Sequence, residues 1–149
     1  DYHPDISDQE RNLITGFKGE ILIYEKLVSL GYNPQCLSIS TADDYTNKVE
    51  INGKLYYCKP NYEKYDIRFK SRSGKEVFVE VKSSTKQKYE QENMPISYRE
   101  LTMVEECNDN CDKIYLIVRV FGIDQTNQDI YIFNGHLWDN DYILRREVE

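Results

Sequence analysis

The fold of this chain is decided by the stretch YDIRFKSRSGKEVFVEVKS, residues 65–83. Its two ends, residues 65–71 and 76–83, are rich in β-branched and aromatic side chains, which favour strands. The four residues between them, Arg-Ser-Gly-Lys, are typical of a short turn. The stretch therefore predicts two adjacent antiparallel strands.

The second of these strands alternates between two kinds of side chain. Neighbouring residues of a strand point to opposite faces, so Glu80 and Lys82 share one face and three valines share the other. An acid and a lysine on a hydrophobic middle strand need a partner or a function, since an unpaired buried charge is very unfavourable. A structural ion pair and a catalytic pair both remain open. We expect the other face to pack against a helix through Val77, Val79 and Val81.

Further elements follow from hydrophobic periodicity and turn signals on both sides of this stretch. An amphipathic helix comes first, and a helix of about ten residues opens on the capping box of Ser97 and Glu100. A hairpin with an Asn52-Gly53 turn is expected within an inserted surface segment, residues 42–64. The other expected ranges are 8–30 for the first helix and 35–41, 114–121 and 129–133 for strands.

These elements place the fold in the α/β class. A strand, helix, strand crossover implies a central mixed sheet flanked by helices, with the core order αβββαβ and one final strand. The length of 149 residues suits one well-buried core and not two, so we expect a single domain, residues 1–149. Because the chain begins at Asp1 rather than Met, we expect it to be part of a larger protein.

Asp66 favours a catalytic role for the pair of Glu80 and Lys82. Hairpin pairing brings the Asp66 carboxylate beside Glu80 at one end of the sheet. Two carboxylates held together repel, so one must take up a proton or both must bind a cation. A hard divalent ion such as Mg²⁺ prefers oxygen ligands and keeps several waters. Lys82 would then orient or deprotonate the attacking water, or stabilise charge on a phosphate oxygen.

Glu20 is the fourth candidate, because its position is unusual for a surface glutamate. It lies on the apolar stripe of the first helix, seven residues before Leu27, and should point toward the sheet. Gly16 and Gly19 weaken this helix by about 1 kcal/mol each, a cost expected where backbone approaches something closely. The alternative is a glutamate at the stripe's edge that extends to water.

Charge is distributed unevenly along the chain. The net charge is -7, which argues against a protein that coats nucleic acid, but residues 64–88 hold eight basic and three acidic side chains. A basic segment in an acidic chain fits a confined phosphate-contacting face, although lysines on the solvent side of a hairpin explain it equally well. The candidate nucleic-acid contacts are Lys70, Arg72, Lys86, Lys88 and Arg99.

Composition excludes several classes of protein. The chain has no apolar run of membrane-spanning length and no signal-peptide pattern, so a cytoplasmic protein without membrane contact is expected. Its four cysteines lack the paired Cys-x-x-Cys spacing of a zinc ribbon, and free thiols are the expected state of Cys36, Cys58, Cys107 and Cys111.

The candidate residues resemble a known pattern in order and spacing. Gly16-x-x-Gly19-Glu20 on a first helix, then Asp66, then Glu80-Val81-Lys82, is similar to the PD-(D/E)XK nuclease superfamily, although Tyr65 stands where that name has proline. Within the superfamily, the chain resembles the protein NO VEIN C-terminal domain. That second resemblance rests on Tyr65-Asp66-Ile67, Phe78 to Ser83, Ile96-Ser97 with Glu100, and Tyr115-Leu116 with Arg119-Val120-Phe121.

The resemblance implies a restriction-endonuclease-like three-layer fold and a nuclease acting on nucleic acid, with DNA the expected substrate. It implies Asp66, Glu80 and the Val81 carbonyl as ligands of Mg²⁺, for which Mn²⁺ should substitute, with Glu20 as an auxiliary ligand. Lys82 would be the catalytic lysine. Related proteins carry ATPase or helicase modules in restriction and phage-defence systems, which implies further domains or subunits here.

Three functions remain open from the sequence. The first is a Mg²⁺-dependent endonuclease that hydrolyses phosphodiesters by attack of water. The second is an inactive module of the same fold that binds nucleic acid or protein, since fold alone does not establish activity. The third is an interaction domain that uses the tyrosine-rich insertion. A homodimer is compatible with each, and Ser97 and Glu100 are explained by helix capping without any role in chemistry.

Overall fold

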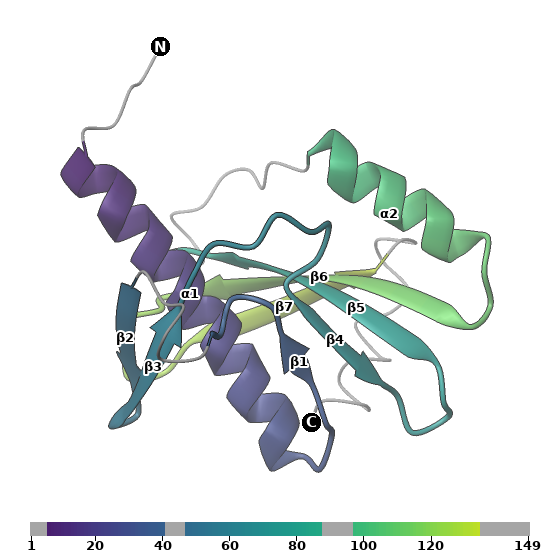
Figure 1. Cartoon of the computed structure of the whole chain (residues 1–149), viewed down its shortest axis with the longest axis horizontal. Coiled ribbons are helices and arrows are strands. Elements are labelled where there is room, and N and C mark those ends of the chain that lie inside the picture. Colours follow the sequence, from purple (N-terminus) through teal and green to yellow (C-terminus); the bar gives the residue numbers. More distant parts are fainter. Residues whose placement is uncertain (1–5, 41–46, 88–96, 135–149) are drawn as a thin grey trace.

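The computed structural model describes residues 6–40, 47–87 and 97–134 (Figure 1). Its order of elements is helix, five strands, helix, two strands. No helix in these ranges is long and apolar enough to cross a membrane. The bounds are α1 Ile6–Ser29, β1 Gln35–Cys36, β2 Asn47–Ile51, β3 Lys54–Cys58, β4 Ile67–Lys70, β5 Glu76–Ser83, α2 Tyr98–Asn108, β6 Lys113–Phe121 and β7 Asp129–Asn134.

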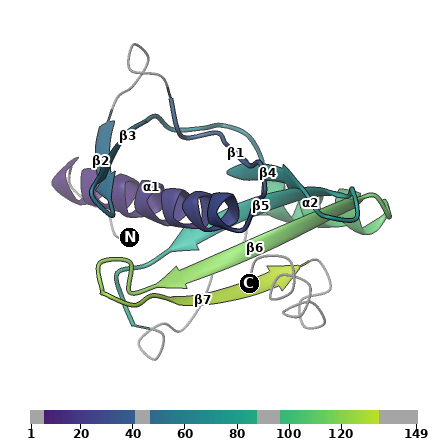
Figure 2. The same ribbon diagram turned by 90° about the horizontal axis from the view of Figure 1, so that it is seen from below.

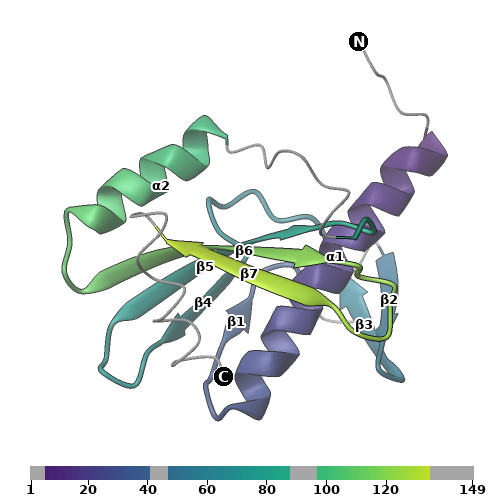
Figure 3. The same ribbon diagram turned by 180° about the vertical axis from the view of Figure 1, so that it is seen from behind.

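The central sheet is mixed, as the sequence predicts. Its strand order is β1-β4-β5-β6-β7, and β5 and β6 are parallel while the other neighbours are antiparallel. The parallel pair is connected through α2, because parallel neighbours need a crossover connection. Seen from behind, β7 lies in front of α1 (Figure 3). The chain is therefore a mixed α/β protein in which β5 is the middle strand of the sheet, between β4 and β6.

The two helices cover opposite faces of β5. Ile23 and Leu27 of α1 pack in one core cluster with the three valines of β5, and Val79 is 1% exposed. Met103 and Cys107 of α2 pack in another cluster with Phe78. The predicted phase of this strand is confirmed, and Glu80 and Lys82 therefore lie on the side covered by α2.

The hairpin formed by β2 and β3 is a separate two-stranded sheet. Asn52 and Gly53 both have positive φ, 51° and 78°, which is the backbone of the predicted two-residue turn. The hairpin lies along α1 (Figure 2), and its inner side packs against Phe17 and Ile21 with Cys58 fully buried. The expectation of a surface insertion is therefore wrong in part, because α1 and the hairpin share a second small core.

Several element boundaries also differ from the prediction, most by one or two residues; strand β4, for example, begins at Ile67 instead of residue 65. Helix α1 begins at Ile6, two residues early, because a cap-like sequence fixes a helix end only to within one or two residues. Strand β1 ends at Cys36 instead of residue 41. The chain turns there, with Ile39 N–H donating to the Cys36 carbonyl, and Ile39 then bridges to Cys58 of the hairpin.

Candidate functional site

Helix α1 reaches the site by crossing β5 at Gly19. A Cβ atom on Gly19 would lie 1.6 Å from Ser83 Oγ and 2.8 Å from Ser83 Cβ, so only glycine allows this approach. The expected close contact is confirmed at this position. At Gly16 no such contact is found, because no atom of the described residues lies within 4 Å of a Cβ there. The crossing places the next residue, Glu20, against the end of the sheet.

Glu20 points inward and is 7% exposed, so it does not extend to water. Ser38 Oγ donates a hydrogen bond of 2.6 Å to Glu20 Oε1. Burial raises the pKa of Glu20, and the neighbouring charge of Asp66 raises this pKa further, against a smaller lowering by the Ser38 hydrogen bond. A buried acid with a neighbouring acid is a position where a cation or a proton is favoured.

Asp66 lies directly before β4. Its side chain, rather than a backbone carbonyl of β4, is the hydrogen-bond acceptor for the next part of β5. The last residue pair between β4 and β5 joins Ile67 to Val79. Beyond it, Asp66 Oδ2 accepts a hydrogen bond of 2.8 Å from the Val81 backbone N–H, and Oδ1 accepts one of 2.9 Å from Asn61. In an extended strand the N–H and C=O of one residue point to the same side. The Val81 carbonyl therefore lies along the same edge as the Asp66 carboxylate.

Glu80 approaches Asp66 from the α2 side of the sheet. Burial raises the pKa of Glu80, and the negative charges of Asp66 and Glu100 raise it further, while Lys82 lowers it. The charge of Asp66 thus acts on both glutamates. The structure brings together Glu20 from one face of the sheet, Asp66 at its edge and Glu80 from the other face, and we call these three residues the acid cluster.

Lys82 has an ionic partner, but that partner is not Glu80. Its Nζ lies 2.9 Å from Glu100 Oε1, and its side chain is 21% exposed. Glu100 is 6% exposed and also closes the predicted capping box, in which Oε1 accepts the Ser97 backbone N–H at 2.8 Å. Capping is therefore confirmed as one role of Glu100. Its contact with Lys82 is a second role, which the capping pattern does not predict.

The candidate nucleic-acid contacts divide between the two ends of the sheet. Lys70 and Arg72 are exposed near the turn between β4 and β5, at the end remote from Asp66. Lys86 is exposed after β5, and Arg99 lies in the first turn of α2, where its guanidinium donates to the Tyr62 carbonyl. Lys88 lies outside the described residues. Lys70 and Arg72 therefore lie away from the acid cluster, at the other end of β4.

Three residues near the acid cluster were missed by sequence reasoning. Ser38 and Asn61 hydrogen-bond to Glu20 and Asp66 from loops with no local signal. Tyr115 of β6 is buried, and its hydroxyl donates to the Lys64 carbonyl at 3.4 Å. Burial raises the pKa of Tyr115, and the negative charges of Glu80, Glu100 and Asp66 add to this. Nothing in the sequence around Tyr115 distinguishes it from a core tyrosine.

The donor atoms at this site fit a hard cation in kind. Three carboxylates and a backbone carbonyl are oxygen ligands of the type that Mg²⁺ and Mn²⁺ take. No group of three His, Cys, Asp or Glu side chains in the described ranges is already arranged as a metal site. Asp66 accepts one hydrogen bond on each carboxylate oxygen, from Val81 and Asn61, and each oxygen keeps a lone pair for a further ligand. The four cysteines are free thiols, as expected.

Comparison with known proteins shows which protein family the chain belongs to. No curated protein matches the chain. A family model matches residues 42–133, a range that includes Asp66, Glu80 and Lys82 and begins after Glu20. That family is described as protein NO VEIN, C-terminal, and the chain belongs to it.

Proposed function

We propose that this chain is a metal-dependent nuclease of the PD-(D/E)XK superfamily, with a restriction-endonuclease-like three-layer fold. One observation carries the proposal: Asp66, directly before β4, raises the pKa of both Glu20 on α1 and Glu80 on β5, and Lys82 follows two residues after Glu80. Clustered buried acids with raised pKa values are concentrated at functional sites. The topology, with helices on both faces of a mixed sheet, supports the same assignment.

The acids would act through a shared cation. Asp66, Glu80 and the Val81 carbonyl would hold Mg²⁺, with Glu20 as an auxiliary ligand, and Mn²⁺ should substitute. The ion would supply charge stabilisation and activation of water. Attack of water on phosphorus breaks one P–O bond, and the leaving oxygen takes up a proton. Lys82 cannot be a ligand as an ammonium, so its role is to orient the water or to stabilise charge on a phosphate oxygen.

The proposal also covers the substrate, the biological context and the partners of the nuclease. DNA is the expected substrate, and restriction or phage defence in the cytoplasm is the expected context. ATPase or helicase modules are the expected partners, in the same protein or as separate subunits. A homodimer remains compatible with the site, because all four candidate side chains come from one chain.

A cleavage assay with plasmid DNA, oligonucleotides and RNA tests the proposal. Wild type should cut at least one of them with Mg²⁺ or Mn²⁺ and none with EDTA. Lys82→Ala should slow cleavage on the order of a hundredfold or more, because it removes a group that acts in the transition state. The matched control is Lys75→Ala, an exposed lysine in the turn between β4 and β5. Absence of any cleavage, or equal rates for Lys82→Ala and wild type, overturns the nuclease function.

The second candidate is an inactive module of the same family. Its support is the ion pair of Lys82 with the buried Glu100, which gives Lys82 a structural partner, together with the lack of a ready-made metal site among the described residues. Glu100→Gln separates the two functions, because glutamine still closes a capping box but carries no charge. A nuclease should change its cleavage rate with this variant, whereas an inactive module should change only its stability.

A further inference from the structure

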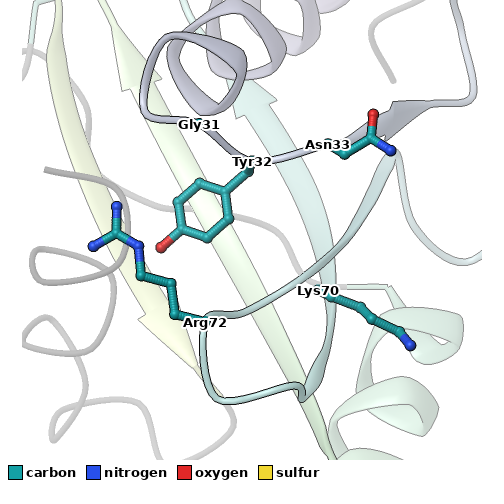
Figure 4. Close-up of a pocket in the computed structure, with 5 residues that line it drawn as sticks. All are labelled: Gly31, Tyr32, Asn33, Lys70 and Arg72. Atoms are coloured by element: carbon teal, nitrogen blue, oxygen red, sulfur yellow. The ribbon is translucent and has the colours of Figure 1, made fainter.

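An open groove runs beside the part of the sheet that α2 leaves uncovered. It consists of two adjoining hollows of about 360 Å³ each, which share Asn33 and Lys70. The first hollow lies between the loop after α1 and the end of β4 (Figure 4). The second follows β1 and β4. We call this surface the basic groove, and its main residues are Tyr32, Asn33, Gln35, Arg68, Lys70 and Arg72.

The register of β1 and β4 shows where the basic groove lies relative to the acid cluster. Gln35 pairs with Arg68 in the register of β1 and β4, and two residues further along this register Asn33 lies beside Lys70. Arg68 and Lys70 are exposed and alternate with the buried Ile67 and Phe69. The next position in this alternation is Asp66, four residues from Lys70 and about 13 Å away at the rise of a strand. Asp66 therefore lies further along β4 from the groove, two residues beyond Arg68.

The charge of the groove is positive within an acidic chain. Among the described residues that line the two hollows, three are cationic, Arg68, Lys70 and Arg72, and one is acidic, Glu76, which lies 2.8 Å from Arg68. The Arg72 guanidinium is held 5.3 Å from the centre of the Tyr32 ring (Figure 4). Lys70 is exposed at the junction of the two hollows. A net positive groove on a protein of charge -7 concentrates anions locally, and lysine and arginine are the usual contacts to phosphate.

We propose that the basic groove binds the backbone of a nucleic-acid strand and guides it to the acid cluster. This proposal rests on the proposed nuclease function. An extended polyanion fits better than a single phosphate, because the cations are spread along β4 and the groove is open. The distance from Lys70 to Asp66 corresponds to about four nucleotides at 3.4 Å per stacked nucleotide. The amides of Asn33 and Gln35 would contact sugar or phosphate oxygens.

Fluorescence anisotropy with labelled single-stranded DNA and RNA, in EDTA so that no cleavage occurs, tests this surface. Lys70→Glu should weaken binding on the order of tenfold, and the slope of log affinity against log salt should fall by about 0.7 for each phosphate that the variant no longer neutralises. Lys54→Glu is the matched control, because Lys54 is an exposed lysine of the hairpin and the charge change is the same. Lys70→Arg should retain affinity, because it keeps the positive charge.

Cleavage by the same variants separates this proposal from the nuclease function. If wild type cuts nucleic acid but Lys70→Glu and Lys54→Glu bind and cut alike, the basic groove is wrong and the nuclease stands. If binding depends on Lys70 but wild type does not cut, the groove stands and the nuclease falls. If wild type binds neither DNA nor RNA, both fail. If Lys70→Glu weakens binding but also lowers the melting temperature well below that of Lys54→Glu, and Lys70→Arg weakens binding as much, misfolding explains the loss and the groove is wrong.

Discussion

The two faces of β5 differ in how their side chains are satisfied. Under α1, the valines pack in a purely apolar cluster, and burial alone accounts for their stability. Under α2, Phe78 is packed in the same way, but Glu80 and Lys82 follow it at the end of the strand. Burying their charges is unfavourable, and it is offset by Glu100 for Lys82 and by a raised pKa for Glu80. Packing explains the valines on the first face, whereas Glu80 on the second face meets Asp66 and Glu20 at the end of the sheet, where we propose the functional site.

The largest difference between the two faces should appear in how the stability of the metal-free protein depends on pH. Burial and neighbouring acids raise the pKa values of Glu20 and Glu80 in the folded state. Between the ordinary glutamate pKa of 4.5 and the raised value of about 9, the folded protein binds protons that the unfolded chain has released. Stability must therefore fall as pH rises across this interval. Thermal unfolding with EDTA measures this decline.

Replacing one acid should flatten the decline. Glu20→Gln removes a group that ionises in this interval, so its melting temperature should depend less on pH than that of wild type. Mn²⁺ should also reduce the dependence, because a cation favours the charged carboxylates. A wild-type melting temperature that stays constant or rises through this interval would mean that the acids are not held as described.

The next largest difference is between the effects on stability of substituting two neighbouring residues, one on each face of β5. Val79→Ala should destabilise the protein by about 2 to 3 kcal/mol, because it leaves a cavity in the cluster under α1. Glu80→Gln, on the opposite face, should leave the stability of the metal-free protein unchanged or raise it, since a neutral group replaces a buried acid. Urea denaturation at neutral pH measures both. Equal losses for the two variants would remove the distinction between a packing face and a site face.

The smallest expected difference is between the two glycines of α1. Gly19→Ala should cost about 1 to 3 kcal/mol, because its Cβ would overlap Ser83, whereas Gly16→Ala should gain up to about 1 kcal/mol of helix stability. Ser83→Gly should restore much of the Gly19→Ala loss. The two alanine variants are compared by thermal unfolding. If both stabilise the helix, α1 does not cross β5 closely at Gly19.

The strands were predictable because their signals are local. Alternation fixed the two faces of β5, and the Asn52-Gly53 pair identified the hairpin turn. The capping box located the start of α2. The packing of the hairpin on α1 was not predictable, since it depends on a contact between segments far apart in the chain. The early end of β1 has the same cause, because the chain leaves the sheet to place Ile39 against Cys58.

The members of the candidate site, including Lys82, could be named from the sequence, but most of their partners could not. Glu20 stood out as an acid on an apolar stripe, and Asp66 and Glu80 as acids on paired strands. The partner of Lys82 was not foreseen, because Glu100 already had a complete local explanation as a cap. Ser38 and Asn61 lie in loops whose hydrogen bonds arise only from tertiary structure. The path from Lys70 to Asp66 likewise depends on strand register, which composition does not contain.

Calorimetry with Mn²⁺ tests most directly whether the acid cluster is a cation site. Wild type should bind a single ion, and Asp66→Asn should lose most of this affinity, because Asp66 links the other two acids. Lys82→Ala should bind as wild type does, since an ammonium is not a ligand. Glu105→Gln, which removes an exposed acid of α2, is the control for net charge. If Asp66→Asn and wild type bind Mn²⁺ equally, the acid cluster is not the metal site of this protein.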